Sequence, residues 1–110
     1  MKRILIIQTA FIGDVILATA LVEKLHDYFP NSEIDFLVRK GNQALLKNNP
    51  HINQVLVWEK GKKKFKHLFS LKRTIKKNRY DIVVTAHRFA SSGYLAAFSG
   101  AKHIVGFKKN

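Results

Sequence analysis

The sequence predicts a single α/β domain built on a parallel sheet, and two observations lead to this prediction. Short apolar, β-branched runs alternate along the chain with longer segments whose apolar residues recur at helical spacing. Strands that alternate with helices are joined by right-handed crossovers, which give a parallel sheet with helices on both faces. With 110 residues, of which 46% are hydrophobic, the chain has enough material for one core. We expect residues 1–110 to form a Rossmann-like domain with strand order 3-2-1-4-5.

The first half of the chain holds two predicted strands and a long helix. Arg3–Gln8 is a continuous apolar run, the pattern of a strand buried on both faces. A helix is predicted from Gly13 to about Phe29, because Pro30 stops it. Its buried face is expected to comprise Val15, Ile16, Leu17, Ala18, Leu21, Val22, Leu25 and Phe29. The second strand is predicted over Glu33–Val38.

The second half continues the alternation. A short helix is predicted over residues 41–48, and a third strand over Gln54–Trp58. A basic amphipathic helix follows from about Lys64 to Asn78. Its inner stripe is expected to comprise Phe65, Leu68, Phe69 and Ile75. A fourth strand, a helix of small residues and a fifth strand are predicted over Asp81–Ala86, Ala90–Ser99 and His103–Phe107.

The composition excludes several kinds of site. Without cysteine the chain can form no disulfide, thiolate metal site or cysteine nucleophile, and this fits a reducing compartment. The five histidines show no ligand spacing, so no metal site is expected. No G-x-S-x-G motif is present, which argues against a serine hydrolase. No stretch approaches the roughly 18 apolar residues of a transmembrane helix.

Two loops are expected at the edge of the sheet where ligands bind. In such sheets this is the carboxyl end of the strands, beside the point where the strand order reverses. The first loop, Thr9–Asp14, has one glycine and is therefore neither a dinucleotide-binding motif nor a P-loop. Asp14 at the helix start could cap the helix or complement its dipole. It could also accept a proton from a hydroxyl as a general base.

The second loop follows the fourth strand and begins at His87. This histidine could donate a hydrogen bond or contact a phosphate, or it could be an ordinary loop histidine. Arg88 beside it could bind an anion, and Ser91 and Ser92 could cap the next helix.

The net charge of +13 is concentrated in one half of the chain. Residues 1–59 carry 6 Lys/Arg against 6 Asp/Glu, whereas residues 60–110 carry 14 Lys/Arg against Asp81 alone. Such a run is commonly a solvated helix face, but its density favours an anionic partner. That partner could be a phosphorylated lipid, a membrane surface, nucleic acid or an acidic protein. No recognisable nucleic-acid-binding module accompanies the charge.

Four stretches, in order and at matching spacing, resemble glycosyltransferase family 9, the ADP-heptose:lipopolysaccharide heptosyltransferases. They are residues 2–22, residues 29–38, the Asn49-Pro-His-Ile-Asn-Gln-Val55 segment, and Tyr80-Asp-Ile-Val-Val84 together with Ser91 and residues 100–107. The resemblance implies the GT-B architecture, in which two Rossmann-like domains face each other across a cleft. The N-terminal domain takes a lipid-linked sugar acceptor, and the C-terminal domain takes the ADP-sugar donor.

The resemblance also implies roles for residues. Asp14 matches the catalytic base proposed for the family, and Gly13 would keep the loop close to the substrate. Thr9, Ala10, His87 and Arg88 would line the acceptor side. Asp14 would deprotonate an acceptor hydroxyl that attacks ADP-heptose with inversion. No cofactor and no metal are expected, because the donor sugar nucleotide is itself a substrate, bound mainly by the second domain.

The resemblance implies a partner for residues 60–110, which carry the net positive charge. An inner-core acceptor carries phosphates and acidic sugars, and it lies in an anionic membrane leaflet. The residues expected to hold it are Lys62, Lys63, Lys64, Lys66, Lys72, Arg73, Lys76 and Lys77. The protein is then expected in the cytoplasm, peripheral to the inner face of the inner membrane, with no specific nucleic-acid partner.

The chain ends at Asn110, after the fifth predicted strand. We therefore expect an N-terminal, acceptor-side fragment that lacks the donor-binding domain and is inactive alone. The alternative is a non-enzymatic basic α/β module that binds anionic lipid or nucleic acid. A flavodoxin-like nucleotide-binding protein is a third candidate, and the glycine-poor first loop argues against it.

Overall fold

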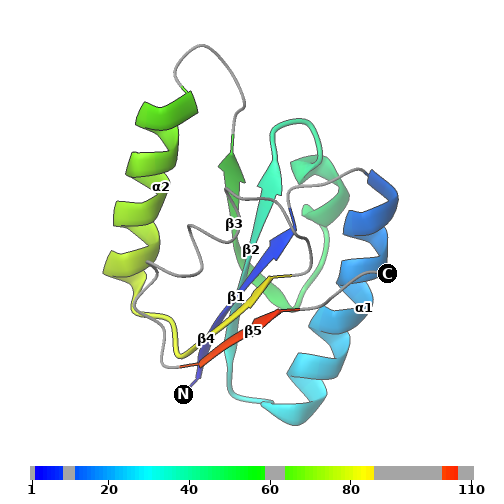
Figure 1. The fold of residues 1–110 in the computed structure, drawn as a ribbon. Helices are drawn as coiled ribbons and strands as arrows, with labels where there is room; N and C mark the ends of the chain where they lie inside the picture. The colour runs from blue at the N-terminus through cyan, green and yellow to red at the C-terminus, as the bar shows by residue number, and fades with distance from the viewer. Residues whose placement is uncertain (1, 9–11, 59–63, 86–102, 107–110) are drawn as a thin grey trace.

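The computed structural model describes residues 2–8, 12–58, 64–85 and 103–106. These residues form a five-stranded parallel sheet in the predicted order, β3-β2-β1-β4-β5 (Figure 1). The strands are β1 (Arg3–Gln8), β2 (Glu33–Arg39), β3 (Ile52–Trp58), β4 (Ile82–Thr85) and β5 (His103–Gly106). The helices are α1 (Ile12–Tyr28), the short 3-10 helix η1 (Gln43–Leu46) and α2 (Lys64–Asn78). Within these ranges no helix is both long and apolar enough to cross a membrane.

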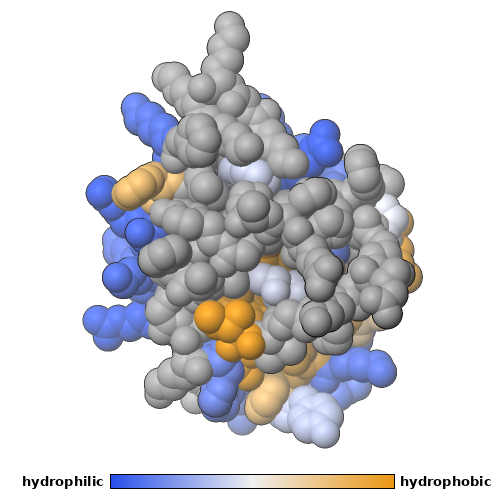
Figure 2. Space-filling view, in the orientation of Figure 1, coloured by the Kyte–Doolittle hydropathy of each residue, from blue (hydrophilic) through white to orange (hydrophobic). Residues whose placement is uncertain are grey.

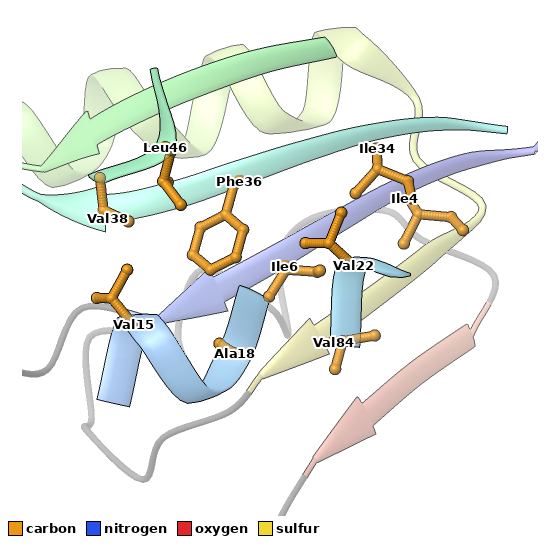
Figure 3. Close-up of a cluster of buried hydrophobic side chains, with 10 residues drawn as sticks. All are labelled: Ile4, Ile6, Val15, Ala18, Val22, Ile34, Phe36, Val38, Leu46 and Val84. Atoms are coloured by element: carbon orange, nitrogen blue, oxygen red, sulfur yellow. The ribbon is translucent and has the colours of Figure 1, made fainter. Parts of the chain in front are cut away.

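Helices cover both faces of the sheet, as predicted, with α1 and η1 on one face and α2 on the other (Figure 1). On the α1 side, Val15, Ala18 and Val22 point from the helix into the sheet (Figure 3). They meet a cluster that comprises Ile4, Ile6, Ile34, Phe36, Val38, Leu46 and Val84. On the α2 side, the cluster comprises Leu71, Ile75, Leu5, Ile7, Leu37, Leu56, Trp58, Tyr80 and Val83. Alternate residues of β1 therefore enter opposite cores, which explains its continuous apolar sequence.

A buried polar network lies near the amino ends of the strands. Asp35 on β2 is 0% exposed and accepts hydrogen bonds from the Tyr80 hydroxyl at 2.5 Å and the Asn53 amide at 3.1 Å. Burial, and then the hydrogen bond to Asp35, raise the pKa of Tyr80 above its ordinary value, so the phenol stays a donor. The Arg3 guanidinium lies 5.6 Å from the centre of the Tyr80 ring and donates to the Asn78 carbonyl. The network thus joins β1, β2, β3 and the end of α2.

Asp81 ties three strands together at the same edge. Its carboxylate accepts a hydrogen bond from the Arg3 backbone N–H at 2.9 Å, and its own N–H donates to the Arg3 carbonyl at 2.7 Å. Its carbonyl accepts from the His103 N–H at 3.0 Å. The Arg3 side chain also lies 3.4 Å from the Glu33 carboxylate. These contacts hold the starts of β1, β4 and β5 in register.

Some predicted boundaries differ from the observed ones. The third strand begins at Ile52 rather than Gln54, because pairing with β2 continues past an irregularity between Ile34 and Asp35. The short helix predicted over residues 41–48 is a single turn of 3-10 helix. The helix predicted over Ala90–Ser99 lies outside the described residues.

Two predicted buried faces were partly wrong. Phe69 was expected inside α2 but is 62% exposed, and Leu71 is buried instead. Leu71 and Ile75 are four residues apart and share one side of the helix, whereas Phe69 points away from that side. In α1, Ile16 and Leu17 are 55% and 69% exposed, because the apolar arc is wider than the surface that the sheet covers.

Candidate functional site

The carboxyl ends of the strands form the edge opposite to the polar network. At this edge β1 ends at Gln8 and its neighbour β4 ends at Thr85, with Ile7 paired to Thr85. The strand order reverses between these two strands, which is where open α/β sheets bind ligands. Gln8 is only 3% exposed, so a buried polar side chain ends the central strand at this point.

Helix α1 begins at the same edge, and its first turn is held by the core. Val15 is 0% exposed and packs with Phe36 and Val38 in the α1-side cluster (Figure 3). Ala18 and Val22 extend the contact along one side of the helix. The backbone of Asp14, which directly precedes Val15, is therefore fixed in the first turn of α1 at the carboxyl edge.

The position of Asp14 suits an anion or a carboxylate. The first four N–H groups of a helix have no partner inside it, and the helix dipole is positive there. The side chain of Asp14 lies outside what the structure describes. Its two roles from the sequence, a cap and a general base, therefore both stay predictions.

Gly13 is exposed in the first turn of α1 and is not required there by the described fold. Its φ is outside the left-handed region, and an added Cβ would meet no described atom within 4 Å. A glycine inside a helix costs about 0.5–1 kcal/mol relative to alanine. The open space and the unfavourable residue type together fit a backbone that a ligand approaches closely.

The other predicted loop residues, Thr9, Ala10, His87 and Arg88, lie outside the described residues. Sequence reasoning missed the two strand-end residues beside these loops, Gln8 and Thr85. The signal was present, since each is a polar residue that ends an otherwise apolar strand. Both strand ends belong to the candidate site by position.

The predicted basic residues also lie partly inside and partly outside the described residues. Lys62 and Lys63 lie outside the described residues, and Lys64 is the first residue of α2, with a side chain that is not described. Among the α2 side chains that the structure describes, Lys66, Arg73, Lys76 and Lys77 are exposed cations. Lys72 is half-buried, with its ammonium 5.2 Å from the centre of the Phe69 ring. Figure 2 shows hydrophilic residues along the side of the molecule where α2 lies.

The structure does not bring Asp14 and the basic residues of α2 onto one surface. Helices α1 and α2 lie on opposite faces of the sheet. Each follows the carboxyl end of a strand, however, because α1 follows β1 and α2 follows β3. The two predicted functional regions therefore share the carboxyl edge but extend from it on different sides.

A histidine pair lies at the far end of α1. The rings of His26 and His51 stack with centroids 3.9 Å apart, and His51 Nε2 lies 3.4 Å from a Glu23 carboxylate oxygen. In the part of the chain that the structure describes, no group of three or more His, Cys, Asp or Glu side chains is arranged to hold a metal ion. The pair is remote from the carboxyl edge, since His26 is in the last turn of α1.

Sequence comparison relates the chain to lipopolysaccharide heptosyltransferases. Lipopolysaccharide heptosyltransferase 3 of Escherichia coli K12 is 33% identical over 76 residues, which cover 66% of this chain and 22% of that protein. Lipopolysaccharide core heptosyltransferase OpsX of Haemophilus influenzae is 27% identical over 106 residues, or 96% of this chain and 30% of the relative. No family model matches the chain.

Solved structures share the fold over nearly the whole chain. The glycosyl transferase family 9 structure from Veillonella parvula matches with a TM-score of 0.86 and 29% identity, covering 94% of this chain and 31% of that one. Escherichia coli ADP-heptose lps heptosyltransferase II, at 24% identity and a TM-score of 0.81, supports the fold over 96% of this chain and 30% of its own. The alternative of a non-enzymatic module gains no support from these relatives.

The chain spans less than a third of the length of these relatives. Within that span both the sequence and the fold agree with them, including the five-stranded sheet of the described residues. The chain belongs to glycosyltransferase family 9, the family of the lipopolysaccharide heptosyltransferases.

Proposed function

We propose that this chain is the N-terminal, acceptor-side domain of an enzyme that transfers heptose from ADP-heptose to the lipopolysaccharide inner core. The observation that carries the proposal is the position of Gly13 and Asp14. They occupy the first turn of α1, beside the switch in strand order, in a fold shared with family 9 structures. Gly13, which directly precedes Asp14 in the chain, leaves open space in the first turn of α1.

The proposed reaction is an inverting displacement. The Asp14 carboxylate takes the proton of an acceptor hydroxyl, whose oxygen attacks the anomeric carbon of the heptose. The bond from that carbon to the diphosphate oxygen breaks, and ADP leaves on the opposite side. The donor supplies the transferred sugar and the base takes the proton, so the step balances without a cofactor.

The partners follow from this assignment. The acceptor is a lipid-linked sugar, and ADP-heptose is held mainly by residues beyond those of this chain, in the second half of a GT-B architecture. We place the protein in the cytoplasm at the inner face of the inner membrane. The cations of α2 support this location, because an anionic leaflet attracts each nearby Lys or Arg by about 1 kcal/mol.

The test replaces Asp14 with asparagine, which keeps the shape of the side chain and removes its basicity. The variant is made in a chimera in which this chain replaces the matching part of Escherichia coli ADP-heptose lps heptosyltransferase II. ADP release with an acceptor should fall by about 100- to 10,000-fold. The matched control is Asp27→Asn, an exposed carboxylate near the other end of α1, which should leave the rate unchanged.

An Asp14→Asn chimera with full activity would contradict the proposal. In that case Asp14 acts only as a helix cap, and the substitution should lower stability by about 1 kcal/mol or less. Measuring thermal unfolding of both variants separates the two roles. Loss of a general base lowers the rate of ADP release alone, whereas loss of a helix cap lowers the stability.

A further inference from the structure

The outer face of α2 has an aromatic residue at its centre. At about 100° per residue, Phe69 lies between Lys72 and Lys76 on one side and Lys66, Arg73 and Lys77 on the other. We call these six residues the cationic face. Leu71 and Ile75 occupy the opposite side of the helix and are buried against the sheet. The face therefore presents one phenyl ring surrounded by five cations.

The core does not account for the position of Phe69. Its side chain is 62% exposed, and it is absent from the buried cluster that Leu71 and Ile75 join. Its described ring contact is with the Lys72 ammonium at 5.2 Å, a distance within the range of a cation–π interaction. Phe69 is therefore an exposed apolar ring among the cations of this face.

The charge of the cationic face is not neutralised within the helix. The sequence of α2, KFKHLFSLKRTIKKN, contains no Asp or Glu. No pair of opposite charges can therefore form at the i, i+3 or i, i+4 spacings along it. The face is complementary to a dense array of anions.

We propose that the cationic face of α2 docks flat on an anionic phospholipid membrane, with lipid phosphates against the cations and the Phe69 ring inserted at the headgroup boundary. Helices that lie on membranes combine Lys and Arg with Phe or Leu in this way, and the buried apolar side chain adds to the electrostatic attraction. Duplex nucleic acid would meet the cations through its phosphates but leave the central ring without an apolar partner. The inference rests on the proposed function in one respect, since a lipid-linked acceptor requires the protein to work at a membrane.

The proposed contact sets the orientation of the active edge. With α2 on the membrane, the sheet lies parallel to the surface, one helix diameter of about 10 Å above it. The carboxyl edge then opens sideways, where the sugar of a membrane-anchored acceptor can reach it. Helix α1 lies on the side of the sheet that faces away from the lipid.

The test measures binding of the 110-residue chain to vesicles by cosedimentation. The vesicles contain phosphatidylglycerol with phosphatidylethanolamine, and pure phosphatidylcholine vesicles provide the neutral comparison. Phe69→Ala should weaken binding to the anionic vesicles about tenfold, because the variant has no aromatic ring to transfer from water into the membrane. Its matched control is Tyr28→Ala, which removes an 83% exposed ring from the opposite side of the sheet. That control should bind as the unchanged chain does.

The charges are tested in the same way. The double variant Lys76→Gln/Lys77→Gln should bind the anionic vesicles about thirtyfold more weakly. The double variant Lys24→Gln/Lys47→Gln removes the same charge from exposed positions outside α2 and should have a much smaller effect. Raising the salt concentration should weaken binding of the unchanged chain.

Equal binding of the Phe69→Ala and Tyr28→Ala variants would overturn the inference, and so would equal binding of the two lysine double variants. Tight binding to a duplex oligonucleotide at physiological salt, without binding to anionic vesicles, would overturn it in favour of nucleic acid. The vesicle assay contains no ADP-heptose. Vesicle binding without transfer by the chimera would therefore reject the proposed reaction alone. Transfer without vesicle binding would reject this inference, together with the support that the α2 cations give to the membrane location, and would leave the proposed reaction standing.

Discussion

The amino and carboxyl edges of the sheet differ in the contacts that the described residues make there. At the amino edge, Asp35 is fully buried and hydrogen-bonded to groups from β3 and from the segment before β4. At the carboxyl edge, Gly13 is a residue that the described fold does not require. Among the described residues, the amino edge therefore holds a buried hydrogen-bonded network that links several elements. At the carboxyl edge, the described residues leave open space beside Gly13 at the start of α1.

The connections of a parallel sheet explain this division. Each helix returns the chain to the amino edge, where the next strand begins beside an existing one. The backbone bonds from Glu33 to Lys2 at 2.8 Å, from Asp81 to Arg3 at 2.7 Å and from His103 to Asp81 at 3.0 Å all lie there. Strand starts are thus locked together. The loops that leave the carboxyl edge can vary without disturbing strand register.

The largest effect on stability is expected from Asp35→Ala. It removes the acceptor for Tyr80 and Asn53 and leaves the buried Tyr80 hydroxyl without its acceptor, which should cost about 3 kcal/mol of unfolding free energy. Urea unfolding of the chain measures the loss. Asp27→Ala, at an exposed position on α1, should change stability by less than about 0.5 kcal/mol. A similar small loss for Asp35→Ala would remove the distinction between the two edges.

A smaller loss is expected from Tyr80→Phe. The ring stays in the core near Arg3, but Asp35 loses the hydrogen bond of 2.5 Å. Removing one buried donor should cost about 1–2 kcal/mol. Tyr28→Phe is the control, because Tyr28 is 83% exposed. Combining Tyr80→Phe with Asp35→Ala should cost less than the sum of the two, since the residues share one hydrogen bond. Additive losses would mean that the two groups act independently.

The hydrogen bonds of the polar network could not be predicted from the sequence, although much of the fold could. The strand order and the bounds of β1 and α2 were predicted correctly, because buried parallel strands and amphipathic helices carry local patterns. Asp35 carried no such signal. Its partner Tyr80 is 45 residues away in the sequence, so only the fold shows that the carboxyl group is satisfied.

The helix faces were harder to predict for a different reason. Periodicity identifies apolar positions, but it does not show how wide an arc a neighbouring sheet covers. Ile16, Leu17 and Phe69 are therefore exposed where burial was expected. For the candidate site, the topological rule placed Gly13 and Asp14 at the carboxyl edge correctly. The rule did not lead to Gln8, because its polar side chain was interpreted only as the end of a strand.

The pH dependence of stability should distinguish Tyr80 from exposed tyrosines. Its pKa is raised in the folded protein, whereas an unfolded tyrosine titrates near its ordinary value of about 10. The stability from this group is thus fully present below about pH 10 and is lost as the pH rises, because unfolding then releases a proton. The advantage of the unchanged chain over Tyr80→Phe should shrink by up to about 1.4 kcal/mol per pH unit above about pH 10. An advantage that stays constant across this range would show that folding leaves the pKa of Tyr80 unchanged.

Gly13→Ala should have the smallest effect on stability and the opposite sign. The added methyl group meets open space among the described atoms, and alanine favours the helix, so stability should rise by about 0.5–1 kcal/mol. In the chimera with the heptosyltransferase, the same methyl group would lie where the acceptor approaches Asp14. Transfer should therefore fall while the unfolding midpoint rises. A variant that gained stability without losing activity would show that no substrate needs the space at Gly13, and the carboxyl edge would lose its clearest sign of a binding site. Opposite changes in stability and rate would instead show that the glycine is kept for the substrate at the expense of the helix.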